Sequence, residues 1–150
     1  MAHTYARIFI HCIFSTKNHQ KIITEDRQER LWAYLGGIAR ENNIKVLAIG
    51  GVEDHAHLFL SFPPSLSVSE AMKRIKGGSS SWIHKNFSSL RNFGWQEGFG
   101  AFSVSPSRAK ATIDYIVEQK EHHRKKTFKE EYLAFLKKYG IEYDEKYLWG

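Results

Sequence analysis

Two histidines, His55 and His57, flank Ala56 within an apolar run that continues through Leu60. The run is typical of a β-strand, and alternate side chains of a strand point to the same face, so we expect both imidazoles on one side of a sheet. Two neighbouring imidazoles on rigid backbone supply half of a divalent-metal site, and a third ligand must come from elsewhere in the fold. A solvated or locally hydrogen-bonded pair is the alternative that this motif leaves open.

A second pair, Tyr115 and Gln119, lies in a helix-like stretch. Four residues make about one helical turn, so the two side chains share a face. A phenol titrates near 10, so Tyr115 needs help to attack a phosphate at neutral pH. A nearby divalent cation could provide that help by polarising the phosphate. With the histidine pair, these groups would form a compact phosphoryl-transfer site. A core tyrosine and a solvated glutamine remain the alternatives, because the sequence does not show that the two pairs meet.

Basic residues gather in two places. The first group interleaves cations with an aromatic ring, and its members are Lys73, Arg74, Lys76, Trp82 and Lys85. Such a pattern is typical of surfaces that bind single-stranded DNA, although charged helix faces are often only solvated. The second group is the run 122–126, His-His-Arg-Lys-Lys. It could complement a helix dipole, or its histidines could supply further metal ligands, because they lie one turn beyond Gln119.

The order of predicted elements indicates the fold. Strand-like runs cover 6–15, 44–50, 55–62 and 99–104. Helices are expected from Thr24 to 42–43, from 67 across the weakening glycines 77–78, from 106 to about Arg124, and from Thr127 to about 140. The order β-α-β-β-α-β predicts an α+β, ferredoxin-like antiparallel sheet with helices on one face and C-terminal helices that carry Tyr115. We expect residues 1–150 to form a single domain.

Composition narrows the class of protein. The formal net charge of +6 is compatible with a polyanionic partner. A lone cysteine, Cys12, excludes an internal disulfide and favours a reducing compartment. The first residues lack the apolar core of a signal peptide, and no segment approaches the length of a membrane span. We therefore expect a soluble, cytoplasmic protein with no membrane partner.

Several sequence words together resemble a known family. They are Asp54–Leu58 (DHAHL), Trp95–Ser105 (WQEGFGAFSVS), Tyr115–Gln119 (YIVEQ), Phe128–Tyr132 (FKEEY) and Tyr143–Tyr147 (YDEKY). In this order and at this length, they resemble the small single-tyrosine transposases of bacterial insertion sequences. That family carries the HUH signature, which is a histidine, a bulky hydrophobic residue and a histidine. Ala56 departs from the signature, because the family has a bulkier side chain at that position.

The resemblance implies a ferredoxin-like homodimer that cleaves single-stranded DNA next to hairpins at the ends of a mobile element. It implies that Tyr115 attacks the scissile phosphate and becomes joined to the 5′ phosphate. It also implies that His55, His57 and Gln119 hold Mg²⁺ or Mn²⁺, and that the tyrosine helix of one subunit can complete the histidine site of the other.

Two other classes stay open from the sequence. Another HUH endonuclease, such as a relaxase or a replication initiator, would share the histidines but is usually a larger chain. A non-catalytic ferredoxin-like module would bind nucleic acid through aromatics on its central strands and would not need Tyr115 together with Gln119.

Overall fold

The computed structural model describes residues 3–123 and 125–150. Its strands are β1 (Phe9–Ser15), β2 (Lys45–Val52), β3 (His55–Ser61) and β4 (Gly100–Ser103). Its α-helices are α1 (Glu25–Glu41), α2 (Val68–Asn86), α3 (Ala109–Val117), α4 (Gln119–His122), α5 (Phe128–Lys138) and α6 (Glu145–Leu148). Three short 3₁₀ helices are η1 (Lys17–His19), η2 (Ser88–Leu90) and η3 (Pro106–Arg108).

The four strands form one sheet in the order β2-β3-β1-β4, with every neighbouring pair antiparallel. This order and the sequence of elements confirm the predicted α+β, ferredoxin-like fold. The central strands β1 and β3 pair over their whole length, with Ile13 opposite His57 and Ser15 opposite His55. The first strand begins three residues later than the sequence indicates, at Phe9 rather than Ala6.

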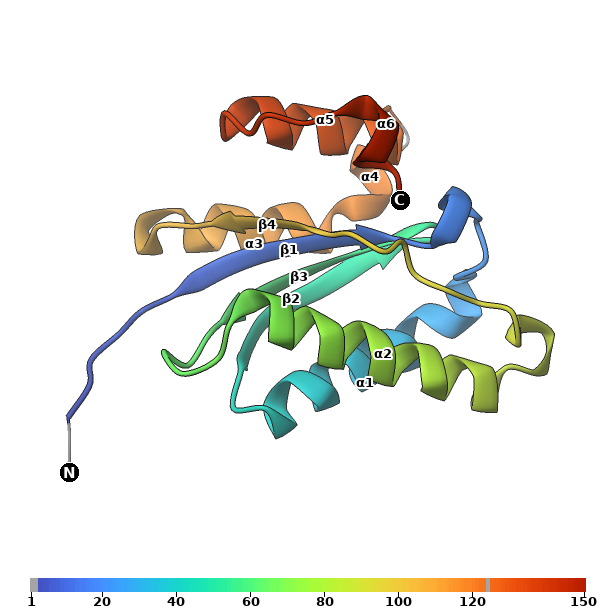
Figure 1. The fold of residues 1–150 in the computed structure, drawn as a ribbon, viewed down its shortest axis with the longest axis horizontal. Helices are drawn as coiled ribbons and strands as arrows, with labels where there is room; N and C mark the ends of the chain where they lie inside the picture. Colours follow the sequence, from blue (N-terminus) through green and yellow to red (C-terminus); the bar gives the residue numbers. More distant parts are fainter. Residues whose placement is uncertain (1–2, 124) are drawn as a thin grey trace.

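Helices cover both faces of the sheet (Figure 1). Helices α1 and α2 lie on one face, and α3 and α5 lie on the other. The pleat of β3 separates its side chains accordingly, because Ala56, Leu58 and Leu60 belong to the core cluster under α1 and α2. His55 and His57 have the opposite parity and therefore face α3 and α5. The pleat thus confirms that both imidazoles share one face.

Two glycines allow close approach of helices. An added Cβ at Gly78 would come within 3.0 Å of Ile38 on α1, so this glycine of α2 lets the two helices pack tightly. The glycine pair does not interrupt α2, which runs unbroken from Val68 to Asn86. An added Cβ at Gly50 would lie 2.7 Å from the carbonyl oxygen of Ile116, so Gly50 lets the end of α3 rest directly on β2.

The third predicted helix is not continuous. It breaks at Glu118, whose φ of −98° and ψ of 20° end α3, and α4 begins at Gln119. The prediction that Tyr115 and Gln119 lie on one unbroken helix was therefore wrong. The predicted helix end at Arg124 falls outside the described residues.

The fourth predicted helix, α5, begins at the capping box foreseen at Thr127 and Glu130, whose side chains bond to each other's backbone N–H groups. Its apolar face packs on β1 and β4 through Phe128, Tyr132 and Leu136. Trp149 of the tail docks against this face, 5.8 Å from the Tyr132 ring centre. No helix within the described residues is long and apolar enough to cross a membrane.

Candidate active site

The floor of the candidate site consists of three histidines on the central strands. His55 and His57 are fully buried on β3, and His11 on β1 is 3% exposed. The Nε2 atom of His11 lies 2.8 Å from Nδ1 of His57. The sequence assigned no role to His11, so its place beside the histidine pair is a finding of the structure.

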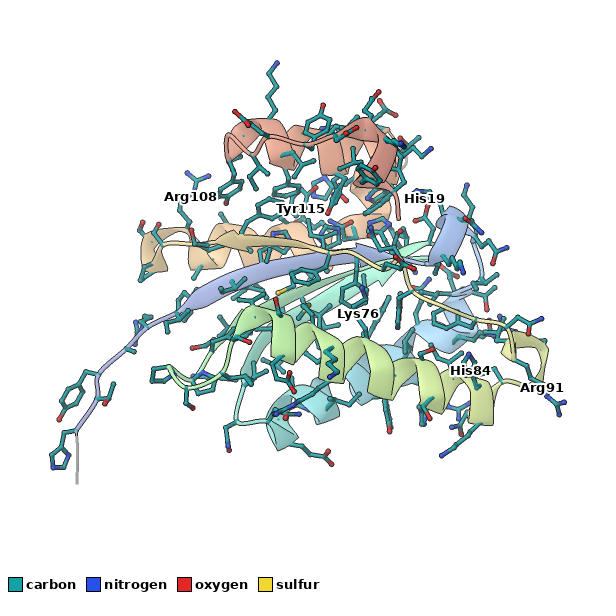
Figure 2. The ribbon with its side chains drawn as sticks, in the orientation of Figure 1. His19, Lys76, His84, Arg91, Arg108 and Tyr115 are labelled. Atoms are coloured by element: carbon teal, nitrogen blue, oxygen red, sulfur yellow. The ribbon has the colours of Figure 1, made fainter. Side chains whose placement is uncertain are left out.

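The walls come from the helices on this face. Tyr115 of α3 stands over the floor, with its ring centre 5.9 Å from that of His57 and 6.4 Å from that of His11. Figure 2 shows Tyr115 in the layer between the sheet and α5. Gln119 is 2% exposed, and its Oε1 lies 3.3 Å from Nε2 of His55. The structure therefore brings together the tyrosine, the glutamine and the two histidines that were singled out from the sequence.

A buried carboxylate, Glu131 of α5, occupies the centre of the cluster. Its Oε1 lies 3.3 Å from Nε2 of His55, 3.0 Å from Nε2 of His57 and 3.1 Å from Nε2 of His123. Its Oε2 accepts a hydrogen bond from the Tyr115 hydroxyl and lies 3.5 Å from Nε2 of Gln119. One carboxylate therefore joins the histidine group on one side and the tyrosine on the other.

Two further contacts orient the histidines. The Nδ1 atom of His55 lies 2.7 Å from the Asp54 carboxylate, and Nδ1 of His57 lies against His11. Each Nδ1 is thus occupied, and each Nε2 is turned toward Glu131. Partners of this kind around metal-ligating histidines select the tautomer and fix the ring orientation.

The charges of the cluster are mutually dependent. Burial alone would lower the pKa of His55, but the carboxylates Asp54 and Glu131 raise it to about 9. Burial lowers the pKa of His57 to about 4 in spite of its bond to Glu131. Burial opposes ionisation of Glu131, yet hydrogen bonds from His123, His55 and His57 hold its pKa well below its usual range. The cluster therefore contains an ionised carboxylate beside at least one imidazolium when no other cation is bound.

The donor set fits a divalent cation. One donor atom from each of His55, His57, His123 and Glu131 lies within 4.8 Å of the other three. Three imidazole nitrogens and a carboxylate oxygen are ordinary ligands of divalent transition metals. The sequence left open that histidines of the 122–126 run supply further ligands, and His123 is the member of that run that lies in the group.

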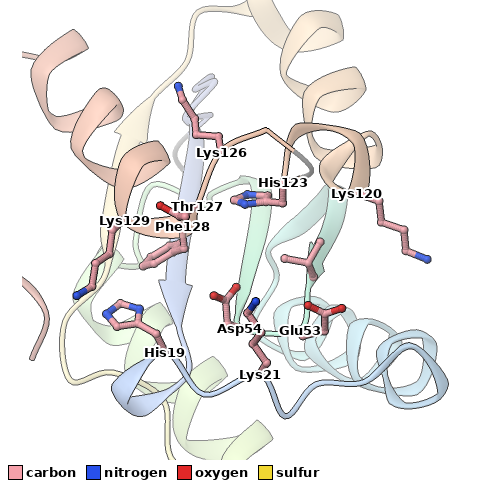
Figure 3. A pocket seen from close by; sticks show the side chains of 11 residues that line it. His19, Lys21, Glu53, Asp54, Lys120, His123, Lys126, Thr127, Phe128 and Lys129 are labelled. Atoms are coloured by element: carbon pink, nitrogen blue, oxygen red, sulfur yellow. The ribbon is translucent and has the colours of Figure 1, made fainter.

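Two cavities flank the cluster. The first, of about 510 Å³, contains four lysines, Lys21, Lys120, Lys126 and Lys129, and reaches the cluster at His123 and Asp54 (Figure 3). Within it Lys120 is paired with Glu25 at 2.6 Å. The second, of about 740 Å³, lies on the other side of the cluster and is lined by Tyr115 and His11. The buried site is therefore approached from two sides.

The predicted DNA-binding residues lie on α2, across the sheet from Tyr115 (Figure 1). Arg74 pairs with Glu70 and with Asn42, and Lys76 donates to the carbonyl oxygens of Glu97 and Gly98. The Trp82 ring stacks on Tyr34 with centroids 4.7 Å apart. The side chains of Lys73 and Lys85 are exposed. Their role in binding DNA stays a prediction.

Sequence reasoning missed Glu131, although a signal for it was present. In α5 the residues Phe128, Tyr132, Phe135 and Leu136 recur at helical spacing, and Glu131 falls on the same face. An acid on the buried face of an amphipathic helix requires a compensating partner, because an unpaired buried charge is strongly unfavourable. His11 carried a weaker signal, which was its parity with Ile13 on the first strand.

Relatives of known type match most of the chain. A family model described as IS200-like transposase matches residues 4–119. The transposase of insertion sequence element IS200 from Salmonella typhimurium is 28% identical over 130 residues, which cover 83% of this chain and 84% of that relative. The ISDra2 transposase TnpA of Deinococcus radiodurans is 26% identical over 114 residues, which cover 73% of this chain and 81% of that relative.

Solved structures share the fold. A candidate transposase from Deinococcus radiodurans superposes with a TM-score of 0.66 at 22% identity, covering 79% of this chain and 95% of that one. A REP-associated tyrosine transposase bound to a REP hairpin gives a TM-score of 0.61 at 17% identity, covering 82% of this chain and 73% of that one. The family match includes the sheet and α1 to α3 and ends at Gln119, so Glu131 lies beyond it. The chain belongs to the family of IS200-like transposases.

Proposed function

We propose that this transposase cleaves and rejoins single-stranded DNA at hairpin-marked element ends through a covalent link between Tyr115 and a 5′ phosphate. The proposal rests on one observation, which is that the candidate nucleophile and the candidate cation ligands all contact Glu131. Its two oxygens join the Tyr115 hydroxyl to the nitrogens of His55, His57 and His123. A nucleophile and a set of cation ligands therefore meet at one point, as nucleotidyl transfer requires.

The proposed cation ligands are His55, His57, His123 and Glu131, with Gln119 Oε1 close enough to His55 to join them. Because the set is rich in imidazole, Mn²⁺ suits it better than Mg²⁺, which prefers oxygen ligands. Such a cation would polarise the scissile phosphate and neutralise the charge that develops on it.

Tyr115 attacks as a neutral phenol. Burial and the neighbouring charge of Glu131 raise the pKa of Tyr115 above its usual range, so the hydroxyl stays protonated. The Tyr115 oxygen forms a bond to phosphorus, and the bond from phosphorus to the 3′ oxygen breaks. Glu131 Oε2 accepts the hydroxyl hydrogen bond and so orients the phenol, and because the pKa of this carboxylate is held well below its usual range, the phenol proton passes to water as the new bond forms. The departing 3′ oxygen takes a proton from water, so the protons balance.

The linkage that results is still a phosphodiester, so its free energy is conserved. A 3′ hydroxyl can reverse the step and rejoin DNA without a nucleotide cofactor. The structural relative bound to a REP hairpin supports a DNA hairpin as the partner of this chain. We also propose a homodimer. Tyr115 here lies beside the histidines of its own chain, so exchange of the tyrosine helix between subunits is a separate proposal.

The proposal is tested with single-stranded DNA that carries the element's own hairpin and flank, labelled at either end. We expect a nick and a denaturant-resistant adduct with Mn²⁺ and neither in excess chelator. Tyr143→Phe serves as a matched control, because Tyr143 is 48% exposed and far along the tail. Cleavage at an unchanged rate in excess chelator would eliminate the role of the cation. Hairpin binding without any cleavage would favour the non-catalytic module.

A further inference from the structure

The larger cavity beside Tyr115 has the chemistry of a nucleotide-binding pocket. We name it the Tyr139 pocket. The lining residues that matter for its chemistry are Arg108, Thr112, Tyr115, Phe135, Lys138 and Tyr139. Its volume of about 740 Å³ is in the range of pockets that enclose small-molecule ligands. We propose that this pocket seats one nucleotide of the single strand next to the scissile phosphate, with its base on Tyr139 and its phosphates at Arg108 and Lys138. This inference rests on the proposed function.

The Tyr139 pocket lies beside the proposed nucleophile. His55 and His57 are fully buried, whereas Tyr115 is only partly buried and lines the Tyr139 pocket. Glu131, which accepts the hydrogen bond of the Tyr115 hydroxyl, does not line the pocket, so a strand that lies there can approach Tyr115 without displacing this carboxylate. The pocket therefore offers a path to the reacting atom that leaves the histidine cluster intact.

The lining of the Tyr139 pocket is positively charged. Arg108 and Lys138 line the pocket, and among the described residues no acidic side chain does. The Arg108 guanidinium forms no hydrogen bond or ion pair with a described residue, although its backbone carbonyl accepts from Thr112 at 3.0 Å. Arg108 stands at the start of α3, the helix that carries Tyr115 (Figure 2). Unpaired cations on a pocket without acids select an anionic ligand such as a phosphodiester.

The Tyr139 pocket also contains an aromatic surface on which a base can stack. The Tyr139 ring packs on Phe102 with centroids 4.8 Å apart, and the residue is still 37% exposed. Phe135 lies nearly parallel beside it. The Lys138 nitrogen is 5.7 Å from the Tyr139 ring centre, so a base stacked on this ring would carry its phosphate close to that cation. Stacking on aromatic rings beside a cationic track is the general mode of single-strand binding.

The test measures affinity in chelator, so that binding is separated from cleavage. The ligand is the hairpin with its single-stranded flank, in a series that lacks one base at a time along the flank. We expect one abasic position to weaken binding about tenfold, the effect of one lost base–aromatic stack. Tyr139→Leu, which keeps apolar contact with Phe102, should weaken binding of the intact flank equally and add nothing at that abasic position. Tyr139→Phe should bind like the wild type.

The cations are tested in the same assay. Arg108→Gln and Lys138→Gln should each flatten the dependence of affinity on salt by about one phosphate contact. Lys137→Gln is the matched control, because Lys137 is adjacent on α5 but does not line the pocket. The assignment would be overturned if the loss of affinity in Tyr139→Leu added to the loss at every abasic position. It would also be overturned if Lys138→Gln and Lys137→Gln changed the salt dependence equally. If Tyr139→Leu and the abasic position give non-additive losses of affinity but the wild type does not cleave the DNA, only the proposed function is refuted.

Discussion

Replacement of Glu131 by glutamine tests whether this carboxylate balances the histidine cluster. Glutamine keeps the shape of the side chain and removes its charge, so packing is preserved. The rise in the pKa of His55 from its ordinary 6.5 to about 9 contributes about 3 kcal/mol to the free energy of unfolding at a pH below 6.5. Asp54 and Glu131 share that effect. Weaker hydrogen bonds from Tyr115 and His123 to the neutral amide add about 1 kcal/mol.

We therefore expect Glu131→Gln to lower the free energy of unfolding by about 2 kcal/mol at pH 6.5 in chelator. The pKa of His55 is raised in the folded state, so its contribution is complete below pH 6.5 and is lost as the pH rises through about 9. The difference between variant and wild type should accordingly shrink to about 1 kcal/mol at pH 9.5.

Urea unfolding followed by tryptophan fluorescence measures this difference at both pH values. Glu142→Gln is the matched control, because Glu142 is exposed on the C-terminal tail, and its effect should be within about 0.5 kcal/mol. Equal or greater stability of Glu131→Gln at pH 6.5 would refute the view that its charge balances a buried imidazolium.

Four other outcomes are expected. Calorimetry should show that His57→Ala abolishes Mn²⁺ binding and leaves hairpin affinity intact, whereas Gln119→Ala weakens Mn²⁺ binding less because a neutral amide is the weaker ligand. Asp54→Asn should lower Mn²⁺ affinity about tenfold, because Asp54 orients His55. Hairpin affinity should fall steeply with salt, and Lys73→Gln should reduce that slope if α2 contacts phosphates. Mixed subunits of His57→Ala and Tyr115→Phe should recover cleavage if the tyrosine is exchanged, and should stay inactive if each chain builds its own site.

Local sequence patterns were sufficient to predict two of the three histidines in the floor of the site. Runs of β-branched and aromatic residues mark the strands, and the two-residue period of a strand places His55 and His57 on the same face. The meeting of these histidines with Gln119 could only be stated as a hypothesis from the residues. It depends on α3 lying directly on β2, which the absence of a side chain at Gly50 permits.

The centre of the site depends on contacts that are distant along the chain. Glu131 meets His57 across 74 residues, and no local pattern encodes that contact. The break at Glu118 also escaped prediction, because both sides of it have helical residues and no proline or glycine marks the interruption. Helix α5 was foreseen from its capping box, but the face that it presents to the histidines follows from its packing on Phe102 and Ile13.

The most direct test of the account is the identity of the residue that becomes joined to DNA. After reaction with a hairpin substrate in Mn²⁺, protease digestion and mass spectrometry should place the 5′ phosphate of the cleaved strand on Tyr115. Tyr115→Phe should bind the same hairpin with unchanged affinity and form no adduct. An adduct on another residue, or one that persists in Tyr115→Phe, would contradict the assignment of Tyr115 as the nucleophile beside the histidine cluster.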